Sequence, residues 1–325
     1  MLTPQTIQNK NILLRLDLDI GLKNGLVEND FRLRAALPTI QFCLQHARKT
    51  IIIGHLGRPK GIDPSHSLEP IRKCLNSLLN QDIPLIPSGN SLGESWTGES
   101  PLALVENLRF DSREEKLDRG FALDLSQGAD IYVYEAFATY HDSTSLTLIP
   151  EILPTVTGFR FDEEVSTLKK VLTNPLRPSL LLASGAKLDK LEIINQIAPK
   201  FDQVLLGGLL GQPTDRTPDG LDLNEETTNK IINAIHQAKT IVFNGPLGFC
   251  EDGLHTKATL ASLQAIVASD AFSVIGGGDT LVALTSLGFS NEAFGFVSTG
   301  GGAMLEYLSK GTHPLLETLK NAKLS

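Results

Sequence analysis

The sequence predicts a doubly wound α/β protein with two parallel sheets joined by a helix. Short, continuously apolar runs alternate with amphipathic stretches along most of the 325 residues, as expected for parallel strands that helices cover on both faces. The irregular, proline-rich stretch PEILPTVTGFRFD at 150–162 separates this alternation into two halves. In the second half, two glycine triplets each follow an apolar run and open a predicted helix.

The predicted strands are short runs rich in Ile, Leu and Val. In the first half they cover 12–17, 50–54, 102–107 and 130–134. In the second half they cover 179–183, 202–207, 240–244, 272–276 and 294–298. Strands that alternate with helices in this way indicate parallel sheets.

Helices are predicted from their caps and end charges. LPTIQFCLQHARK is predicted to be helical with Pro38 near its first turn. In NEETTNKIINAIHQAK, Asn224 can cap the helix, and acidic residues occupy the first turn. EEVSTLKKVLTNP is predicted to be one isolated helix that closes at Pro175. We therefore predict an N-terminal domain at 1–162, a connecting helix at 163–175 and a C-terminal domain at 176–310.

Composition narrows the class of protein. A net charge of −8 and a pI near 5.4 argue against nucleic acid or an anionic membrane as a general partner. No stretch reaches the roughly 20 apolar residues of a membrane span, and the N-terminus lacks a signal-peptide layout. Cys43, Cys74 and Cys250 are unclustered and show no metal-binding spacing, which favours a reducing compartment. We expect a cytoplasmic protein.

The first glycine triplet lies in SVIGGGDTLVAL, and the second lies in STGGGA. Because ligands of open parallel sheets bind beyond the carboxyl ends of the strands, both triplets are candidate sites for phosphate at a helix N-terminus. Asp279 is then predicted to reach Mg²⁺, with Thr280 as a hydroxyl partner. The alternative is that Asp279 only caps the helix and that the glycines only permit tight packing. Neither G-x-x-x-x-G-K-[ST] nor G-x-G-x-x-G occurs, which argues against a P-loop enzyme and a dinucleotide oxidoreductase.

The first half carries arginines where predicted strands end or in the loops beside them. These are Arg15, Arg32, Arg58 and Arg109, with His55 in the loop of Arg58. Together they would form one cationic surface for an anion with several oxygens, whereas any one alone would be an ordinary surface ion pair. A small anion on one half and a metal-bound nucleotide on the other suit a kinase whose domains close around its substrates.

These motifs resemble, in order along nearly the whole chain, the signature segments of the phosphoglycerate kinase family. The segments are LLRLDLD, RLRAALPTI, GHLGRPKG, VENLRF, SGAK, FNGPLGFCE, VIGGGDT and STGGGAMLEYL. The resemblance implies two Rossmann-like domains, with a tail at 311–325 that returns to the first. It also implies a phosphotransferase with a carboxyl acceptor, which interconverts 1,3-bisphosphoglycerate and Mg-ADP with 3-phosphoglycerate and Mg-ATP. We further expect a monomer.

The resemblance also implies site residues. Those expected to hold the phosphoglycerate are Asp17, Leu18, Asp19, Arg32, His55, Leu56, Gly57, Arg58, Arg109 and His141. Those expected at the nucleotide are Lys187, Lys190, Asn244, Glu251, Gly276, Gly277, Gly278, Asp279 and Thr280, with Asp279 on Mg²⁺. The groups expected to act on the transferring phosphoryl group are Arg32, Lys187, Gly277 and Gly301. Positioning and electrostatic stabilisation suffice, so no covalent intermediate or general base is expected.

The chain departs from the family pattern in both halves. Asp19 replaces a usual asparagine, and Asp142 replaces the substrate-binding arginine unless Lys60 or Arg113 substitutes for it. In the second half, the lysine pair is shortened to KLDK, and a long stretch is missing before PDGLDLNEE, where QPTDRTPDG is predicted to be a loop.

Three functions follow as hypotheses. The leading one is an active, shortened phosphoglycerate kinase. The alternative is a nucleotide-binding homologue with a lost or altered acceptor, which Asp19 and Asp142 motivate. The third is a non-catalytic interaction protein, against which the retained Arg32, Lys187, Asp279 and glycine triplets argue.

Overall fold

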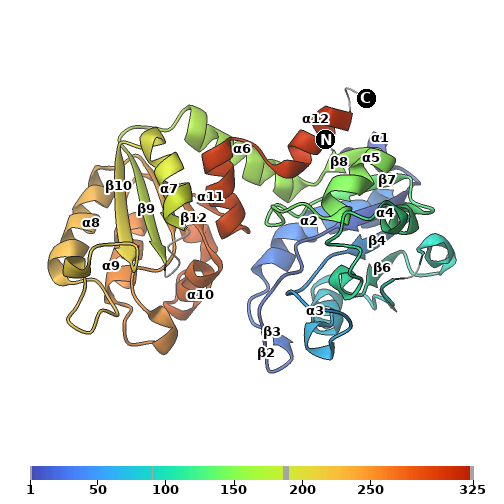
Figure 1. Cartoon of the computed structure of the whole chain (residues 1–325), viewed down its shortest axis with the longest axis horizontal. Coiled ribbons are helices and arrows are strands. Elements are labelled where there is room, and N and C mark those ends of the chain that lie inside the picture. Colours follow the sequence, from blue (N-terminus) through green and yellow to red (C-terminus); the bar gives the residue numbers. More distant parts are fainter. Residues whose placement is uncertain (1, 90, 186–189, 323–325) are drawn as a thin grey trace. The chain divides into compact units, whose positions relative to one another are not determined.

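The computed structural model describes residues 2–89, 91–185 and 190–322 (Figure 1). Contacts within the chain divide it into two units, one made of Met1–Glu164 with Thr312–Ser325 and the other of Val165–Gly311. Helix α6 (Phe159–Thr173) contains the boundary between them and begins four residues before the predicted connecting helix. The C-terminal segment is thus part of the first unit, although almost 150 residues of the second unit separate it from Glu164.

The first unit is built on a parallel sheet with the strand order β5-β6-β4-β1-β7-β8. Its strands are β1 (Asn11–Arg15), β4 (Lys49–Ile53), β5 (Leu85–Ile86), β6 (Leu102–Val105), β7 (Ile131–Tyr134) and β8 (Thr155–Thr157). Its helices are α1 (Pro4–Ile7), α2 (Phe31–His46), α3 (Glu69–Leu79), α4 (Arg119–Ser126), α5 (Ile149–Ile152) and α12 (Pro314–Ala322). Shorter helical turns are η1 (Pro64–His66), η2 (Gly93–Thr97), η3 (Leu108–Phe110) and η4 (Thr144–Leu148).

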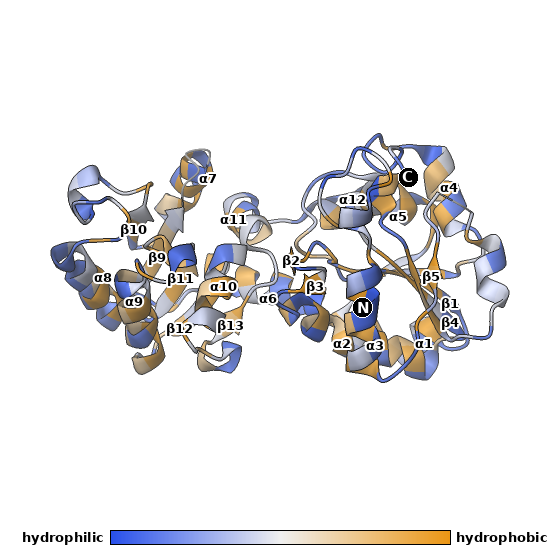
Figure 2. Cartoon of the chain, turned by 90° about the horizontal axis from the view of Figure 1, so that it is seen from below, coloured by the Kyte–Doolittle hydropathy of each residue, from blue (hydrophilic) through white to orange (hydrophobic). Residues whose placement is uncertain are grey.

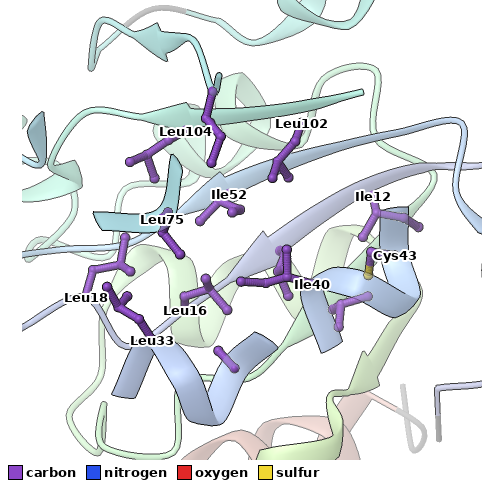
Figure 3. Packing of buried hydrophobic residues seen from close by; sticks show 14 of the residues in the cluster. Ile12, Leu16, Leu18, Leu33, Ile40, Cys43, Ile52, Leu75, Leu102 and Leu104 are labelled. Carbon is purple, nitrogen blue, oxygen red and sulfur yellow. The ribbon is translucent and has the colours of Figure 1, made fainter. Parts of the chain in front are cut away.

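The core of the first unit lies where helices α2 and α3 pack on the sheet. Figure 3 shows Ile12 and Leu16 near β1 facing Ile40 and Cys43 of α2, with Ile52, Leu102 and Leu104 on the neighbouring strands. These strands are buried at every position, which is why each contains an apolar run, at 12–14 in β1, 51–53 in β4 and 102–105 in β6. In Figure 2 the strands around β1 and β5 are mostly orange, while the helices carry blue as well.

The second unit is built on a smaller parallel sheet with the order β10-β9-β11-β12-β13. Its strands are β9 (Ser179–Gly185), β10 (Gln203–Gly208), β11 (Thr240–Asn244), β12 (Phe272–Gly276) and β13 (Phe296–Val297). Its helices are α7 (Lys190–Ile197), α8 (Glu225–Gln237), α9 (Lys257–Ala268), α10 (Gly278–Ser286) and α11 (Gly301–Lys310), with turns η5 (Ala198–Lys200), η6 (Pro213–Asp215), η7 (Cys250–Asp252) and η8 (Asn291–Ala293). The predicted class, two doubly wound parallel-sheet units, is confirmed.

Local predictions had mixed outcomes. The Asn224 cap is confirmed, because its side chain accepts from the backbone N–H of Thr227 at 2.8 Å. The placement of Pro38 near a first turn is wrong, because α2 begins at Phe31 and contains Pro38 in its interior. A proline there leaves the carbonyl of Arg34 without its helical partner, which is tolerated because Arg34 is exposed to water. The sequence pattern does not predict β5, β8 or the hairpin of β2 (Leu22–Lys23) and β3 (Leu26–Val27), because these strands have only two or three residues each.

Candidate active site

The first candidate site lies at the carboxyl ends of adjacent strands in the first unit. Arg15 is the last residue of β1, His55 follows β4, and Arg109 follows β6. Because β6, β4 and β1 are neighbours in a parallel sheet, these side chains emerge at one edge. The charges of Arg15, Arg109, Arg32 and Arg58 all act on His55. The sequence-predicted arginines therefore gather around one histidine, in what we call the arginine cluster.

His55 is held as a neutral imidazole. Burial, and then the charges of the four arginines, lower its pKa well below the usual value. The fully buried Arg15 donates from Nη2 to Nδ1 of His55 at 2.6 Å. Since a guanidinium only donates, Nδ1 must accept, and the ring proton lies on Nε2. His55 therefore offers an N–H donor from the ring edge opposite Arg15.

Arg15 is satisfied by the protein interior rather than by water. Its Nε donates to Ser145 Oγ at 3.1 Å, and its Nη1 donates to the carbonyl of Leu16. Ser145 in turn donates its hydroxyl to the buried carboxylate of Glu114 at 2.6 Å. Burial raises the pKa of Glu114, and the charge of Arg15 opposes this shift. Arg15 thus supports His55 from behind and is not exposed to a ligand.

Asn107 fixes the loop that carries His55 and Arg58. Its buried side chain donates to the carbonyls of Leu56 at 2.7 Å and His66 at 2.9 Å. Its Oδ1 accepts from the N–H groups of Leu56 at 3.2 Å and Arg109 at 3.1 Å. One amide therefore joins the strand ends of β4 and β6.

Asp17 and Asp19 both accept hydrogen bonds from backbone N–H groups, and Asp19 is exposed. The carboxylate of Asp17 accepts from the N–H of Ala138 at 2.7 Å and from the Thr139 hydroxyl at 3.1 Å. Burial raises the pKa of Asp17, against the opposing charges of Arg32 and Arg15. The carboxylate of Asp19 accepts from the N–H of Gly57 at 2.8 Å, so its negative charge holds the loop of Arg58.

The remaining residues predicted to bind phosphoglycerate differ in how available they are. Arg58 and His141 are exposed, and neither has a hydrogen-bond or ion-pair partner among residues 2–89, 91–185 and 190–322. Arg109 is half-buried, donates to the carbonyl of Gly57 at 2.6 Å and pairs with Glu115 at 3.2 Å. Arg32 donates to the carbonyl of Asp19. Leu18 and Leu56 have buried side chains, so only their backbones are available to a ligand.

The glycine triplets of the second unit pack against each other. A Cβ on Gly301 would lie 2.2 Å from the Cα of Gly277, and one on Gly276 would lie 2.7 Å from Met304 Cε. Gly277 also has a φ of +115°, which side-chain residues rarely adopt. Nothing lies within 4 Å of a Cβ on Gly278 or Gly302, and both are exposed. Tight packing therefore explains Gly276, Gly277 and Gly301 but not Gly278 or Gly302.

These turns leave two helix N-termini at the carboxyl ends of adjacent strands. Helix α10 follows β12, and α11 follows β13, which is the neighbour of β12. The first N–H groups of each helix have no partner in the helix and carry partial positive charge. The two exposed glycines lie in these first turns, so an anion can approach the backbone there without meeting a side chain.

Asn244 and Thr280 are engaged in supporting the turns. Asn244 Nδ2 donates to the carbonyl of Gly301 at 3.1 Å. The Thr280 hydroxyl donates to the carbonyl of Gly276 and accepts from the N–H of Gly245, each at 2.9 Å. Because this hydroxyl is buried and has two partners, the structure does not support Thr280 as a metal ligand. The shape of the turns thus depends on both side chains.

Other predicted nucleotide residues are spread around these turns. Lys187 lies outside the described residues. Lys190 begins α7, and its Nζ lies 3.5 Å from the carbonyl of Ser184 at the end of β9. Glu251 is exposed in η7, beyond β11.

Asp279 is the candidate magnesium ligand. It is exposed in the first turn of α10, and the part of the chain that the structure describes offers it no hydrogen-bond or ion-pair partner. The described residues contain no group of three or more His, Cys, Asp or Glu that could hold a metal ion. This arrangement fits Mg²⁺, which is commonly held by one or two carboxylates together with substrate phosphates and water.

The structure answers whether Arg113 substitutes for the missing arginine. Its guanidinium pairs with Asp111 at 2.7 Å and Asp124 at 3.1 Å, and it stacks over Phe121. Arg113 therefore stabilises its own loop and does not replace the missing substrate-binding arginine. Lys60 is exposed, and Asp142 is exposed with its carboxylate accepting from the Thr147 hydroxyl at 3.2 Å.

The predicted loop at 212–220 closes the second unit where the missing stretch would lie. Arg216 donates to the carbonyls of Gly208 and Gly211, each at 3.0 Å, and pairs with Leu223 in an isolated bridge. A short turn, η6, accompanies the loop.

Sequence reasoning missed the supporting side chains of the arginine cluster, namely Asn107, Glu114 and Ser145. Asn107 lies two residues before Arg109 in the segment VENLRF, and a polar residue at the end of an apolar strand was the available signal. No comparable signal links Glu114 or Ser145 to Arg15, because their contacts span 31 and 130 residues.

The chain matches known proteins along most of its length. The family model described as phosphoglycerate kinase matches residues 2–214 and 212–311. This chain belongs to the phosphoglycerate kinase family. It is 32% identical to the phosphoglycerate kinase of Moorella thermoacetica, covering 93% of this chain and 94% of the relative, and 31% identical to that of Thermus thermophilus, covering 96% and 97%. The predicted family and the predicted class of enzyme, a phosphotransferase, are confirmed.

Solved structures of phosphoglycerate kinases share the fold. The one from Pyrococcus horikoshii matches with a TM-score of 0.86 at 26% identity over 98% of both chains. The one from Coxiella burnetii matches with a TM-score of 0.79 at 27% identity over 97% of both chains.

The comparisons also bear out the shortening. The alignment with the Moorella relative extends over 370 positions, more than the 325 residues of this chain. The two parts of the family match meet at 212–214, in the loop that Arg216 holds. In a separate observation, none of the helices in the described residues is long and apolar enough to span a membrane.

Proposed function

We propose that this chain transfers a phosphoryl group reversibly between 1,3-bisphosphoglycerate and Mg-ADP, giving 3-phosphoglycerate and Mg-ATP. The observation that carries the proposal is that this chain, a member of the family, contains two different kinds of anion site, one in each unit. The first unit gathers arginines around a neutral histidine, and the second presents two glycine-opened helix N-termini. A small phosphorylated acid suits the first kind of site, and nucleotide phosphates suit the second.

In the first unit, we assign acceptor binding to exposed or half-buried cations and to one neutral donor. Arg58 and Arg109 provide positive charge, and His55 provides an N–H donor whose direction Arg15 sets. Arg32 neutralises charge on the phosphoryl group during transfer. Because the pKa of His55 is lowered well below its usual value, the imidazole is uncharged at neutral pH and serves as a donor.

In the second unit, we assign nucleotide phosphates to the first turns of α10 and α11. Gly278 and Gly302 leave the backbone N–H groups open, while Gly277 and Gly301 set the path of the turns. Asp279 would hold Mg²⁺, which supplies positive charge against the nucleotide phosphates. We assign Lys190, Asn244 and Glu251 to the same nucleotide site. We also propose that the chain is a cytoplasmic monomer, and its free cysteines fit a reducing compartment.

The chemistry requires no proton transfer. An oxygen of the 3-phosphoglycerate carboxylate attacks the γ-phosphorus of ATP, the bond from this phosphorus to the β,γ-bridging oxygen breaks, and ADP leaves with that electron pair. The reverse reaction returns the phosphoryl group to ADP. Fixed positive charge and aligned N–H groups therefore provide the stabilisation that the reaction needs.

The experiment is coupled turnover with 3-phosphoglycerate and Mg-ATP, applied to the wild type and to a matched pair of variants. Arg32→Ala removes an arginine of the cluster, whereas Arg34→Ala removes an exposed arginine on the same helix that pairs with Asp30. We expect turnover in the wild type and in Arg34→Ala, and a loss of at least about 100-fold in Arg32→Ala. A folded wild type that binds Mg-ADP but gives no product at millimolar 3-phosphoglycerate contradicts the proposal.

That negative result would favour a second candidate, a nucleotide-binding homologue with an altered acceptor. Asp142 and the engaged state of Arg113 favour it, because they leave the acceptor site with fewer available cations than the family pattern. Turnover with another small carboxylic acid would then identify it.

A further inference from the structure

The start of the C-terminal tail lies against the loop that holds Asp17. His313 is fully buried, and its ring is surrounded by those of Phe161, Tyr140 and Phe137, with centroids 4.9, 5.0 and 5.4 Å away. Its Nε2 lies 3.1 Å from the carbonyl of Phe137. The Tyr140 hydroxyl donates to the carbonyl of Thr312 at 2.5 Å, so loop and tail are tied in both directions.

The hydrogen bonds fix the protonation of His313. A carbonyl oxygen only accepts, so Nε2 carries the proton and donates to Phe137. Nδ1 accepts from the N–H of Leu315 at 3.2 Å. Burial lowers the pKa of His313 to about 4, so the ring keeps this neutral form at physiological pH. Both ring nitrogens are therefore engaged.

A single peptide group connects His313 with Asp17. The carbonyl of Phe137 and the N–H of Ala138 belong to the same planar unit, whose orientation is fixed as a whole. His313 binds its carbonyl, and the carboxylate of Asp17 accepts from its N–H at 2.7 Å. A donor on the carbonyl also polarises the peptide and strengthens the N–H as a donor. The imidazole thus acts on Asp17 through three atoms of backbone.

We infer that His313 is a positioning residue for acceptor binding, which sets the orientation of the Phe137–Ala138 peptide and through it the carboxylate of Asp17. The inference rests on the proposed function and on the role that the family resemblance implies for Asp17, which is to hold the phosphoglycerate. It makes the C-terminal tail part of the acceptor site in the first unit.

The test compares two changes at His313 with one at its neighbour. His313→Leu keeps an apolar side chain but loses the donor, and His313→Gln retains an N–H at the corresponding position. Leu315→Ala removes a fully buried side chain from α12, which begins directly after His313, and leaves the imidazole in place. We expect His313→Leu to raise KM for 3-phosphoglycerate about three- to tenfold, with kcat and KM for ATP within twofold of the wild type. His313→Gln should recover most of this loss, and Leu315→Ala should lower Tm without the KM effect.

Equal KM increases in Leu315→Ala and His313→Leu would assign the effect to tail packing and overturn the inference. An unchanged KM in a folded His313→Leu would overturn it as well.

A second measurement does not depend on turnover. Hydrogen exchange at the Ala138 amide should be faster in His313→Leu than in the wild type and in His313→Gln. An unchanged rate overturns the inference, even if the proposed reaction is correct. If the wild type shows no turnover, the proposed function fails, and the exchange rate alone decides whether His313 orients the peptide.

Discussion

The two units build their anion sites from different materials. In the first unit, the site consists of side chains. Arg15 orients the ring of His55, and Asn107 and Asp19 hold the backbone N–H groups of Arg109 and Gly57. In the second unit, the site is backbone, and its shape depends on the atoms that Gly277 and Gly301 lack.

This difference predicts how each site responds to mutation. A network of several hydrogen bonds can lose one contact and retain the others. Substitutions in the arginine cluster should therefore cause graded losses of binding and stability. Two backbones in contact cannot accommodate a methyl group without moving apart, so changes in the glycine turns should be abrupt.

The largest expected effect comes from Gly301→Ala. Its Cβ would lie 2.2 Å from Gly277 Cα, and both partners are backbone, which cannot give way as a side chain can. We expect the free energy of unfolding of the second unit to fall by about 3 kcal/mol and nucleotide affinity to be lost with it. Urea unfolding and Mg-ADP titration measure the two effects.

Gly302→Ala is the control, because it lies in the same helix and its Cβ would meet nothing within 4 Å. It should retain stability or gain up to about 1 kcal/mol from the better helix propensity of alanine. Equal destabilisation by both variants would show that the contact between the turns is not what limits the site.

The next effect is expected from Asn107→Ala in the first unit. The substitution leaves the N–H groups of Leu56 and Arg109 and two carbonyls without their partner. We expect a loss of about 2–3 kcal/mol in stability and a rise of at least tenfold in KM for 3-phosphoglycerate, with KM for ATP unchanged. Asn107→Asp, which keeps the acceptor and loses the donor, should give an intermediate KM. A rise in KM for ATP as large as that for 3-phosphoglycerate would contradict the separation of the two sites.

A smaller change, with the opposite sign, is expected from Asp142→Arg. This substitution removes an exposed carboxylate from the acceptor side and adds a cation, so it should tighten 3-phosphoglycerate binding about tenfold. Thr147→Val is the control, because it removes the hydrogen bond to Asp142 without a change in charge. Weaker binding in Asp142→Arg would show that residue 142 does not face the acceptor.

The smallest effect is a pH dependence at the edge of the second unit. The hydrogen bond to Asp252, and then that to Asp219, raise the pKa of His255 above its usual value. Because the folded state binds this proton more tightly than the unfolded state, the contribution is fully present below about pH 6.5 and is lost as pH rises through the raised pKa. The difference in urea midpoint between the wild type and His255→Gln should therefore shrink from pH 6 to pH 9. A difference that grows with pH would contradict this assignment.

The sequence predicts much of the second site and less of the first. A glycine triplet after an apolar strand directly predicts a site made of backbone groups, because glycine is the residue type that lacks a Cβ. Even so, the sequence could not separate Gly301, which packs on Gly277, from Gly302, which is open, since that distinction depends on a neighbour 24 residues away.

The positions of the predicted strand ends locate the arginine cluster, but they do not predict the separate role of each arginine. Arg15 and Arg58 have similar positions in the sequence pattern, yet Arg15 is fully buried and Arg58 is exposed. The sequence predicts a negative charge at Asp19 beside the ligand, but it does not predict the hydrogen bond that this carboxylate accepts from the N–H of Gly57. Such roles depend on long-range contacts, for which a single sequence carries no periodic signal.

The most direct test of the two-site account measures the binding of each ligand to two single variants by calorimetry. Arg58→Ala removes an exposed cation of the first unit, and Gly278→Ala adds a methyl group where the fold leaves open space in the second. The account predicts that Arg58→Ala weakens 3-phosphoglycerate binding at least tenfold and leaves Mg-ADP binding unchanged, and that Gly278→Ala does the reverse. Weaker binding of both ligands in either folded variant, or of neither ligand in both, would contradict it.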